Sequence, residues 1–240
     1  MQLPTRAATT AVFALAALAA RAHPTMADVS LIWRPLGEPG CGGDITAVRI
    51  NPHNTTQIFI AGDMLGVGVS MDGGRSFSSP NASSFLSYEA ADFSFDPVLR
   101  RVYVATASGP YYSNMSTPLQ WQSIREGMPA VDSVYGGYPA AMQIILIDPA
   151  SAGRRLVALG GSKRGWARVH NAGTVWESID AGESWRNISR VAPASYKSAN
   201  VMAAAWSAGE TVWAAVKGVG MSRSVDGGLT WEVRWPAGQI

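Results

Sequence analysis

Cysteine and histidine are scarce in this sequence, and their scarcity excludes two kinds of site. Cys41 is the only cysteine, so no disulfide can form within the chain. The three histidines, His23, His53 and His170, are isolated from one another, and a single cysteine cannot complete a zinc site. The sequence also lacks a G-x-x-x-x-G-K-[ST] phosphate loop and a G-x-S-x-G nucleophile elbow. We therefore expect neither a metal nor a cofactor.

The sequence also has few charged residues and no long apolar run. Charged residues make up 15% of the chain and the formal net charge is +2, which does not favour a nucleic-acid partner. The longest apolar run, Ala11 to Ala20, is about half of the roughly 20 residues that span a bilayer. It follows Arg6 and is closed by the small-x-small triplet Ala20-Arg21-Ala22. The pattern predicts a signal peptide at 1–22, no membrane span, and a secreted, extracellular protein at 23–240.

An octapeptide with the pattern S-x-D-x-G-x-[ST]-[WF] occurs three times. We expect a strand to end at its Ser and its Asp to accept hydrogen bonds from the backbone of the following turn. The Gly provides a left-handed backbone position, and the aromatic residue begins the next strand and packs beneath the turn. The residues concerned are Ser70, Asp72, Gly74, Phe77, Ser178, Asp180, Gly182, Trp185, Ser224, Asp226, Gly228 and Trp231.

This repeat resembles the Asp-box (BNR) repeat of β-propellers such as sialidases, family 74 xyloglucanases and sortilin-type receptors. The resemblance implies an all-β fold of four-stranded blades with Asp-box hairpins. Phe77, Trp121, Trp185 and Trp231 mark units of about 45 residues, a length typical of propeller blades. The second unit has lost its box, and the third carries an insertion of about 20 residues. We expect four blades, at about 31–80, 81–125, 140–190 and 197–240.

Four blades are few for this class, since Asp-box propellers usually have six or more. An open set of blades would leave unpaired edges and half-covered faces. We therefore expect the chain to be a fragment of an incomplete propeller that continues beyond residue 240. A closed four-bladed ring is the alternative.

The first unit resembles the first blade of family 74 glycoside hydrolases more closely. Trp33 and the glycine-rich run 40–43 are followed by the segments 45–52 and 60–66, which match the family's order of motifs. The resemblance implies that Asp63 is the catalytic base of an inverting hydrolysis. The family's Arg-Thr before this Asp is replaced by Ala61-Gly62, and its partner acid belongs to a second propeller that this chain does not contain. The alternative is that Asp63 only closes a turn.

Three aromatic residues of the long third unit are candidates for binding a sugar, because aromatic faces suit the C–H faces of sugar rings. They are Tyr135, Tyr138 and Trp166. Covering the edge of the sheet is an equally good interpretation of them. A sialidase would need an arginine triad and an [FY]-R-I-P segment, of which Trp33-Arg34-Pro35 is a faint trace.

Together these features predict a secreted, glycoside hydrolase-like propeller whose substrate is a β-glucan or xyloglucan-type polysaccharide. The alternative is a non-catalytic propeller that binds a protein or a glycan, as sortilin-type receptors and photosystem assembly factors do. The fold alone does not separate the two. The substitution Asp63→Asn does, because an enzyme would lose turnover while a binding module would be unaffected.

Overall fold

The computed structural model describes residues 43–129, 141–161, 172–196 and 199–238. All of them belong to one compact unit, Leu36–Ile240. The predicted signal peptide lies outside the described residues, as does the strand expected at Ile32-Trp33. In the part of the chain that is described, there is no helix long and apolar enough to cross a membrane.

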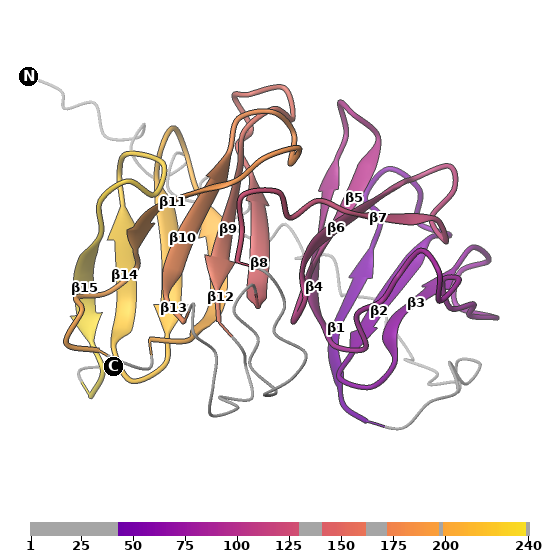
Figure 1. Cartoon of the computed structure of the whole chain (residues 1–240), viewed down its shortest axis with the longest axis horizontal. Coiled ribbons are helices and arrows are strands. Elements are labelled where there is room, and N and C mark those ends of the chain that lie inside the picture. Colours follow the sequence, from indigo (N-terminus) through magenta and orange to yellow (C-terminus); the bar gives the residue numbers. More distant parts are fainter. Residues whose placement is uncertain (1–42, 130–140, 162–171, 197–198, 239–240) are drawn as a thin grey trace, which may run out of the picture. The chain divides into compact units, whose positions relative to one another are not determined.

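Every element of the described chain is a β-strand, and the strands form four antiparallel sheets in chain order (Figure 1). We refer to these sheets as blades 1 to 4. Blade 1 contains β1 (Ile45–Ile50), β2 (Ile58–Gly62) and β3 (Gly66–Ser70). Blade 2 contains β4 (Ala90–Asp96), β5 (Arg101–Thr106), β6 (Gly109–Asn114) and β7 (Trp121–Ser123).

Blade 3 contains β8 (Met142–Ile147), β9 (Leu156–Gly160), β10 (Thr174–Ser178) and β11 (Arg186–Arg190). Blade 4 contains β12 (Val201–Trp206), β13 (Val212–Val216), β14 (Gly220–Ser224) and β15 (Glu232–Pro236). Each sheet is a meander in which consecutive strands pair. In blade 1 the fourth strand is reduced to a single bridge between Val69 and Ser78. The all-β prediction is confirmed.

The apolar core lies between consecutive blades, because each sheet buries residues on both of its faces. Phe59, Val67, Phe93 and Trp121 belong to the cluster between blades 1 and 2. Tyr103, Ile145, Trp176 and Trp185 fill the space between blades 2 and 3, and Val157, Val175, Val201 and Val212 that between blades 3 and 4. Each such side chain stabilises the fold by roughly 1.5–3 kcal/mol on burial. The first strands of adjacent blades are in contact as well.

A hydrogen bond to a main-chain carbonyl also joins each pair of consecutive blades. The donor is always a long polar side chain at, or just before, the start of the second strand of a blade. The acceptor lies in the turn between the third and fourth strands of the next blade. Gln57 Nε2 donates to the Met115 carbonyl at 2.7 Å, Arg101 Nη1 to Ala181 at 3.3 Å, and Arg155 Nη2 to Gly227 at 3.2 Å. We call these three bonds the carbonyl latches.

Candidate functional site

The three Asp-box turns have the same hydrogen bonds. In the turn of blade 3, Ser178 Oγ donates to Asp180 Oδ1 at 2.7 Å and accepts from the Gly182 N–H at 2.7 Å. Asp180 accepts from the N–H of Ser184 at 2.9 Å and from its hydroxyl at 2.5 Å. The turns that begin at Ser70 and Ser224 repeat these four bonds within 0.2 Å. Both oxygens of each carboxylate are therefore engaged by its own turn.

These hydrogen bonds hold the box aspartates in the charged form. The hydroxyl and N–H of Ser76, with the Ser70 hydroxyl, hold the pKa of Asp72 far below its ordinary value. Burial by itself would raise the pKa values of Asp180 and Asp226, but the bonds from Ser184 and Thr230 outweigh it and lower both. A carboxylate that stays ionised and accepts only from its own turn is suited to stabilising that turn rather than to proton transfer.

Asp63 lies at the opposite end of blade 1 from its Asp box. Register pairs Ile45 with Gly62 and Gly62 with Gly66 at one end of the sheet, and Ile58 with Ser70 at the other. Asp63 directly follows Gly62, whereas Asp72 follows Ser70. The candidate base is therefore separated from the structural aspartate by the length of the sheet.

Asp63 is fixed to the residue that precedes β1. Its Oδ1 accepts a hydrogen bond from the Asp44 N–H at 2.8 Å, and its own N–H donates to the Asp44 carbonyl at 3.1 Å. Gly43 stands against this carboxylate with φ of +114°, and a Cβ built on it would collide with Asp63 Oδ1. The absence of a side chain at position 43 is therefore what admits the carboxylate to this place. Asp63 itself is partly exposed.

The connection from blade 1 to blade 2 reaches the same end of the sheet, and it was not singled out from the sequence. The Gly66 N–H donates to the Tyr88 carbonyl at 2.9 Å, and Thr46 Oγ1 donates to the Ala90 carbonyl at 2.6 Å. The side chain of Tyr88 is 54% exposed and Glu89 is half-buried. An aromatic residue and a second acid therefore belong to the segment that is bonded to the Asp63 turn. Their only sequence signal was their position just before a strand.

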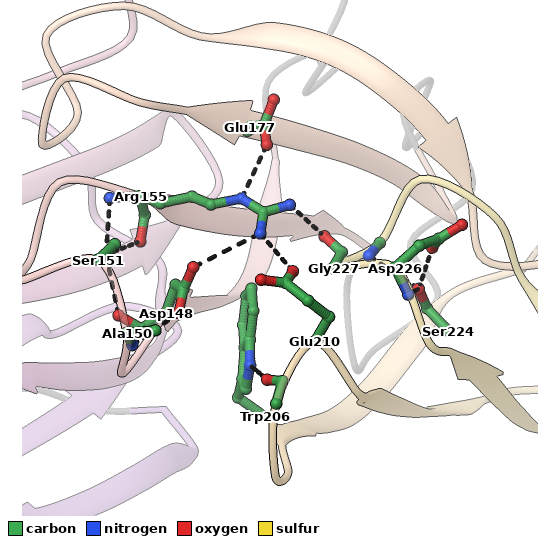
Figure 2. A network of polar contacts seen from close by, with 12 residues as sticks. Asp148, Ala150, Ser151, Arg155, Glu177, Trp206, Glu210, Ser224, Asp226 and Gly227 are labelled. Carbon is green, nitrogen blue, oxygen red and sulfur yellow. Dashed lines mark hydrogen bonds and ion pairs between the residues drawn. The ribbon is translucent and has the colours of Figure 1, made fainter.

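The largest described cluster of charged side chains lies instead between blades 3 and 4 (Figure 2). Arg155 Nε donates to Glu177 Oε1 at 2.9 Å, and its Nη1 lies 2.5 Å from Glu210 Oε2 and 3.5 Å from Asp148 Oδ2. Arg186 Nη2 donates to Glu177 Oε2 at 2.6 Å. Because each of these acids is paired with an arginine and the Arg155 guanidinium also makes a carbonyl latch, we interpret the cluster as structural.

The predicted sugar-binding residues Tyr135, Tyr138 and Trp166 lie outside the described residues. They remain predictions. Among the residues that are described, no group of three or more His, Cys, Asp and Glu side chains is placed to hold a metal ion. Trp121 and Trp185 are buried, and Trp231 is half-buried beside the cluster between blades 3 and 4.

Comparison with known proteins was informative only at the level of structure. No family model and no curated protein matches the sequence. An ancestral GH74 enzyme matches with a TM-score of 0.62 and 21% identity over 87% of this chain and 26% of its own. The fold is a β-propeller. The Niastella koreensis GH74 enzyme matches with a TM-score of 0.54 and 17% identity over 78% of this chain and 29% of its own.

The propeller fold is thus shared with proteins of different kinds. YCF48 bound to D1 peptide matches with a TM-score of 0.50 and 15% identity over 83% of this chain and 56% of its own. This propeller chain spans about a quarter of the length of the two GH74 enzymes. The predicted resemblance of the fold to GH74 propellers is confirmed. At sequence identities this low, the matches show a shared fold and do not show a shared activity.

Proposed function

We propose that this propeller acts in the hydrolysis of a β-glucan of the xyloglucan type, with Asp63 as the general base of an inverting reaction. The substrate class rests on the resemblance of the first blade to family 74 and on the propeller fold shared with two GH74 enzymes. The observation that carries the proposal is the Asp63 carboxylate, which is anchored at the end of β2 by the Asp44 N–H at 2.8 Å. As the sequence predicts a signal peptide, the reaction would be extracellular.

The anchoring bond suits a general base. A main-chain N–H donor fixes the oxygen that accepts its bond, and this holds the carboxylate in one orientation. In an inverting hydrolysis the base takes a proton from the attacking water while a carboxylic acid, roughly 6.5–9.5 Å away, protonates the leaving oxygen. Tyr88, exposed on the neighbouring segment, supplies an aromatic face for a sugar ring.

The partner acid belongs to a second propeller in family 74, so the test needs a substrate that does not require one. Dinitrophenyl β-cellotrioside has a leaving group that departs without protonation, so the base alone accelerates its hydrolysis. We expect the full chain to release dinitrophenolate, and Asp63→Asn to lower the rate by about 10²–10⁴-fold. Asp44→Asn is the matched control, because it keeps the main-chain N–H that holds Asp63 and removes only the neighbouring charge.

Two further measurements separate the possible outcomes. Thermal unfolding of each variant shows whether a lost rate reflects lost folding. Glu89→Gln should leave the rate of dinitrophenyl glycoside hydrolysis unchanged, since that reaction needs no acid. If Glu89 is the acid, the same variant should abolish cleavage of xyloglucan itself. Equal rates for wild type and Asp63→Asn on the dinitrophenyl glycoside would remove Asp63 from the mechanism.

One observation favours the alternative of a non-catalytic glycan-binding propeller. Asp63 and Asp44 exchange two hydrogen bonds, one in each direction, which is also what an aspartate that only closes a turn would do. In that case Asp63→Asn should bind xyloglucan as tightly as wild type in affinity electrophoresis, and neither protein should release dinitrophenolate. The same variant therefore decides between the two functions.

A further inference from the structure

A polar pocket of about 360 Å³ lies between blades 2 and 3, and the proposed hydrolysis does not use it. Its wall in blade 2 is made by the start of β5, by β6, by β7 and by the segment that follows β7. Its wall in blade 3 is the Asp-box turn that contains Ala181 and Glu183. The volume falls in the range of small-molecule sites. The pocket lies beside the Asp-box turn of blade 3. Asp63 lies in the turn between β2 and β3 of blade 1, at the opposite end of that blade from its Asp box, so the two sites are distinct.

The segments that form the pocket are held rigidly against each other. Trp185 Nε1 donates to the Ile124 carbonyl at 2.6 Å, and the Trp185 N–H donates to the Glu126 carbonyl at 2.9 Å. Both bonds join the box turn of blade 3 to the end of blade 2, and Trp185 is buried. The lining side chains are therefore presented by a fixed frame.

Arg101 lies over the Tyr112 ring in this pocket. Its guanidinium carbon is 4.2 Å from the centre of the Tyr112 ring, and its Nη1 donates to the Ala181 carbonyl at 3.3 Å. Tyr112 is fixed in turn, because its hydroxyl donates to Gln122 Oε1 at 2.9 Å. Arg101 also hydrogen-bonds the buried Tyr103 hydroxyl. An arginine has five N–H donors in a rigid fork, so a guanidinium held by a ring face, one carbonyl and one hydroxyl still has N–H donors for a carboxylate.

The other charges of the pocket limit what that carboxylate can belong to. Arg125 is a second, half-buried cation, and within the described residues neither it nor Arg101 forms an ion pair. Glu126 and Glu183 also line the pocket and are exposed. They repel a ligand with several negative charges, whereas carboxylates are strong acceptors for hydroxyl groups. One carboxylate together with several hydroxyl groups therefore matches the pocket best.

We propose that this pocket binds a uronic-acid residue of an acidic polysaccharide. Arg101 and Arg125 bind its carboxylate, and Gln122, Glu126 and Glu183 accept hydrogen bonds from its hydroxyl groups. The site would attach the propeller to an acidic glycan independently of any cleavage at Asp63, so either proposal can fail without the other.

Calorimetric titration of the full chain with methyl β-D-glucuronoside tests the site. Methyl β-D-glucoside has the same ring without the carboxylate, and N-acetylaspartate amide carries a carboxylate without the ring. We expect the glucuronoside to bind at least about tenfold more tightly than either, since a hydrogen bond to a charged group is worth about that factor or more. Arg125→Gln and Arg101→Gln should each weaken glucuronoside binding by about tenfold, and Glu183→Gln by less.

The control variant is Arg75→Gln, which removes an exposed arginine of the blade 1 Asp-box turn and should bind as wild type. Arg101 also makes a carbonyl latch, so thermal unfolding must show that Arg101→Gln is folded, while Arg125→Gln tests the site without touching a latch. The proposal would be overturned if the glucoside or N-acetylaspartate amide bound as tightly as the glucuronoside, or if Arg125→Gln bound the glucuronoside as wild type does. It would also be overturned if the glucuronoside did not bind at about 10 mM, roughly ten times the Kd of a weak site.

Discussion

Arg155 Nη2 donates to the Gly227 carbonyl at 3.2 Å, and this bond ties blade 3 to the Asp-box turn of blade 4 (Figure 2). The same guanidinium also contacts Glu177 within its own blade and Glu210 in the next. Burial alone would lower the pKa of Arg155, but Glu210 and Glu177 outweigh it and raise that pKa, so the cation is stabilised where it stands. A Cβ at position 227 would collide with this guanidinium, so the glycine leaves room for Arg155 where it stands.

Replacing Arg155 should therefore destabilise the fold strongly. The Arg155 side chain is 17% exposed, and those of its partners Asp148 and Glu177 are 6% and 5% exposed. Arg155→Met keeps most of the apolar stem but leaves these buried carboxylates without their shared cation. Removing one partner of a buried ion pair costs about 3–5 kcal/mol. We expect a loss near the lower value, since Arg186 still binds Glu177, measured as the free energy of unfolding in urea.

The matched control is Arg234→Met, which breaks the pair between Arg234 and Glu232 at 3.1 Å on the surface of blade 4. Both side chains are largely exposed, and such pairs contribute less than about 1 kcal/mol. If the two variants lose equal stability, the latch and its network do not hold blades 3 and 4 together.

The left-handed backbone of the Asp-box turns predicts one stabilising substitution. The residue after the box aspartate has φ of +74° at Gly73, +62° at Ala181 and +67° at Gly227. A residue with a Cβ costs about 1–2 kcal/mol more in this conformation. Ala181→Gly should therefore stabilise the protein by about 1 kcal/mol, seen as a rise of about 2–4 °C in Tm for a domain of this size.

The reverse change, Gly73→Ala, isolates the backbone effect, since a Cβ there would meet no atom within 4 Å. It should lower Tm by a similar amount. Unchanged Tm values for both variants would mean that the positive φ at this position carries no strain in the folded protein.

The lowered pKa values of the box aspartates predict the direction of the acid response. An unfolded aspartate titrates near its ordinary pKa of 3.8, and folding depresses the pKa values of Asp72, Asp180 and Asp226 below it. Their contribution to stability is complete above the unfolded value and is lost as the pH falls through the folded values. Urea unfolding at pH values from 7 to about 2 should show a steady decrease that begins near pH 4. Asp180→Asn should be less stable at pH 7 but lose less on acidification.

How much of this could be anticipated differs between the fold and the site. Asp72, Asp180 and Asp226 were recognisable from sequence because their bonds are local, within four residues, and such bonds leave a fixed spacing. Trp121 also marked its blade without a box, since an aromatic residue is large enough to be needed at that core position. Local geometry and large apolar side chains thus made the propeller predictable.

Contacts between blades left no such pattern. Gln57, Arg101 and Arg155 all make carbonyl latches, yet they differ in chemistry, and each partner lies more than 50 residues away. Their shared position at the start of the second strand is visible only once the blades are aligned. Asp63 was found through a resemblance, whereas its anchor, the Asp44 N–H, is a main-chain group that any residue type supplies. Tyr88 and Glu89 likewise became candidates only through the Gly66 bond that brings their segment to the Asp63 turn.

The close approach of Gly43 to Asp63 offers a test of the site that leaves its carboxylate in the chain. At position 43 φ is +114°, and an alanine Cβ would occupy the place of Asp63 Oδ1. Gly43→Ala should therefore displace the carboxylate from the Asp44 N–H without changing the net charge. A general base must stay within hydrogen-bond reach of its water, so a shift of this kind should lower the hydrolysis of the dinitrophenyl glycoside by about as much as Asp63→Asn.

The displacement itself can be followed by NMR, because an amide proton that is bonded to a carboxylate resonates downfield and exchanges slowly. The Asp44 amide should lose both properties in Gly43→Ala and in Asp63→Asn, and keep them in Gly73→Ala, which introduces the same methyl group at the other end of the blade. If the Asp44 amide signal shifts in Gly43→Ala while the rate stays at the wild-type value, the position of the Asp63 carboxylate does not matter to the chemistry. Asp63 would then act only in closing the turn after β2.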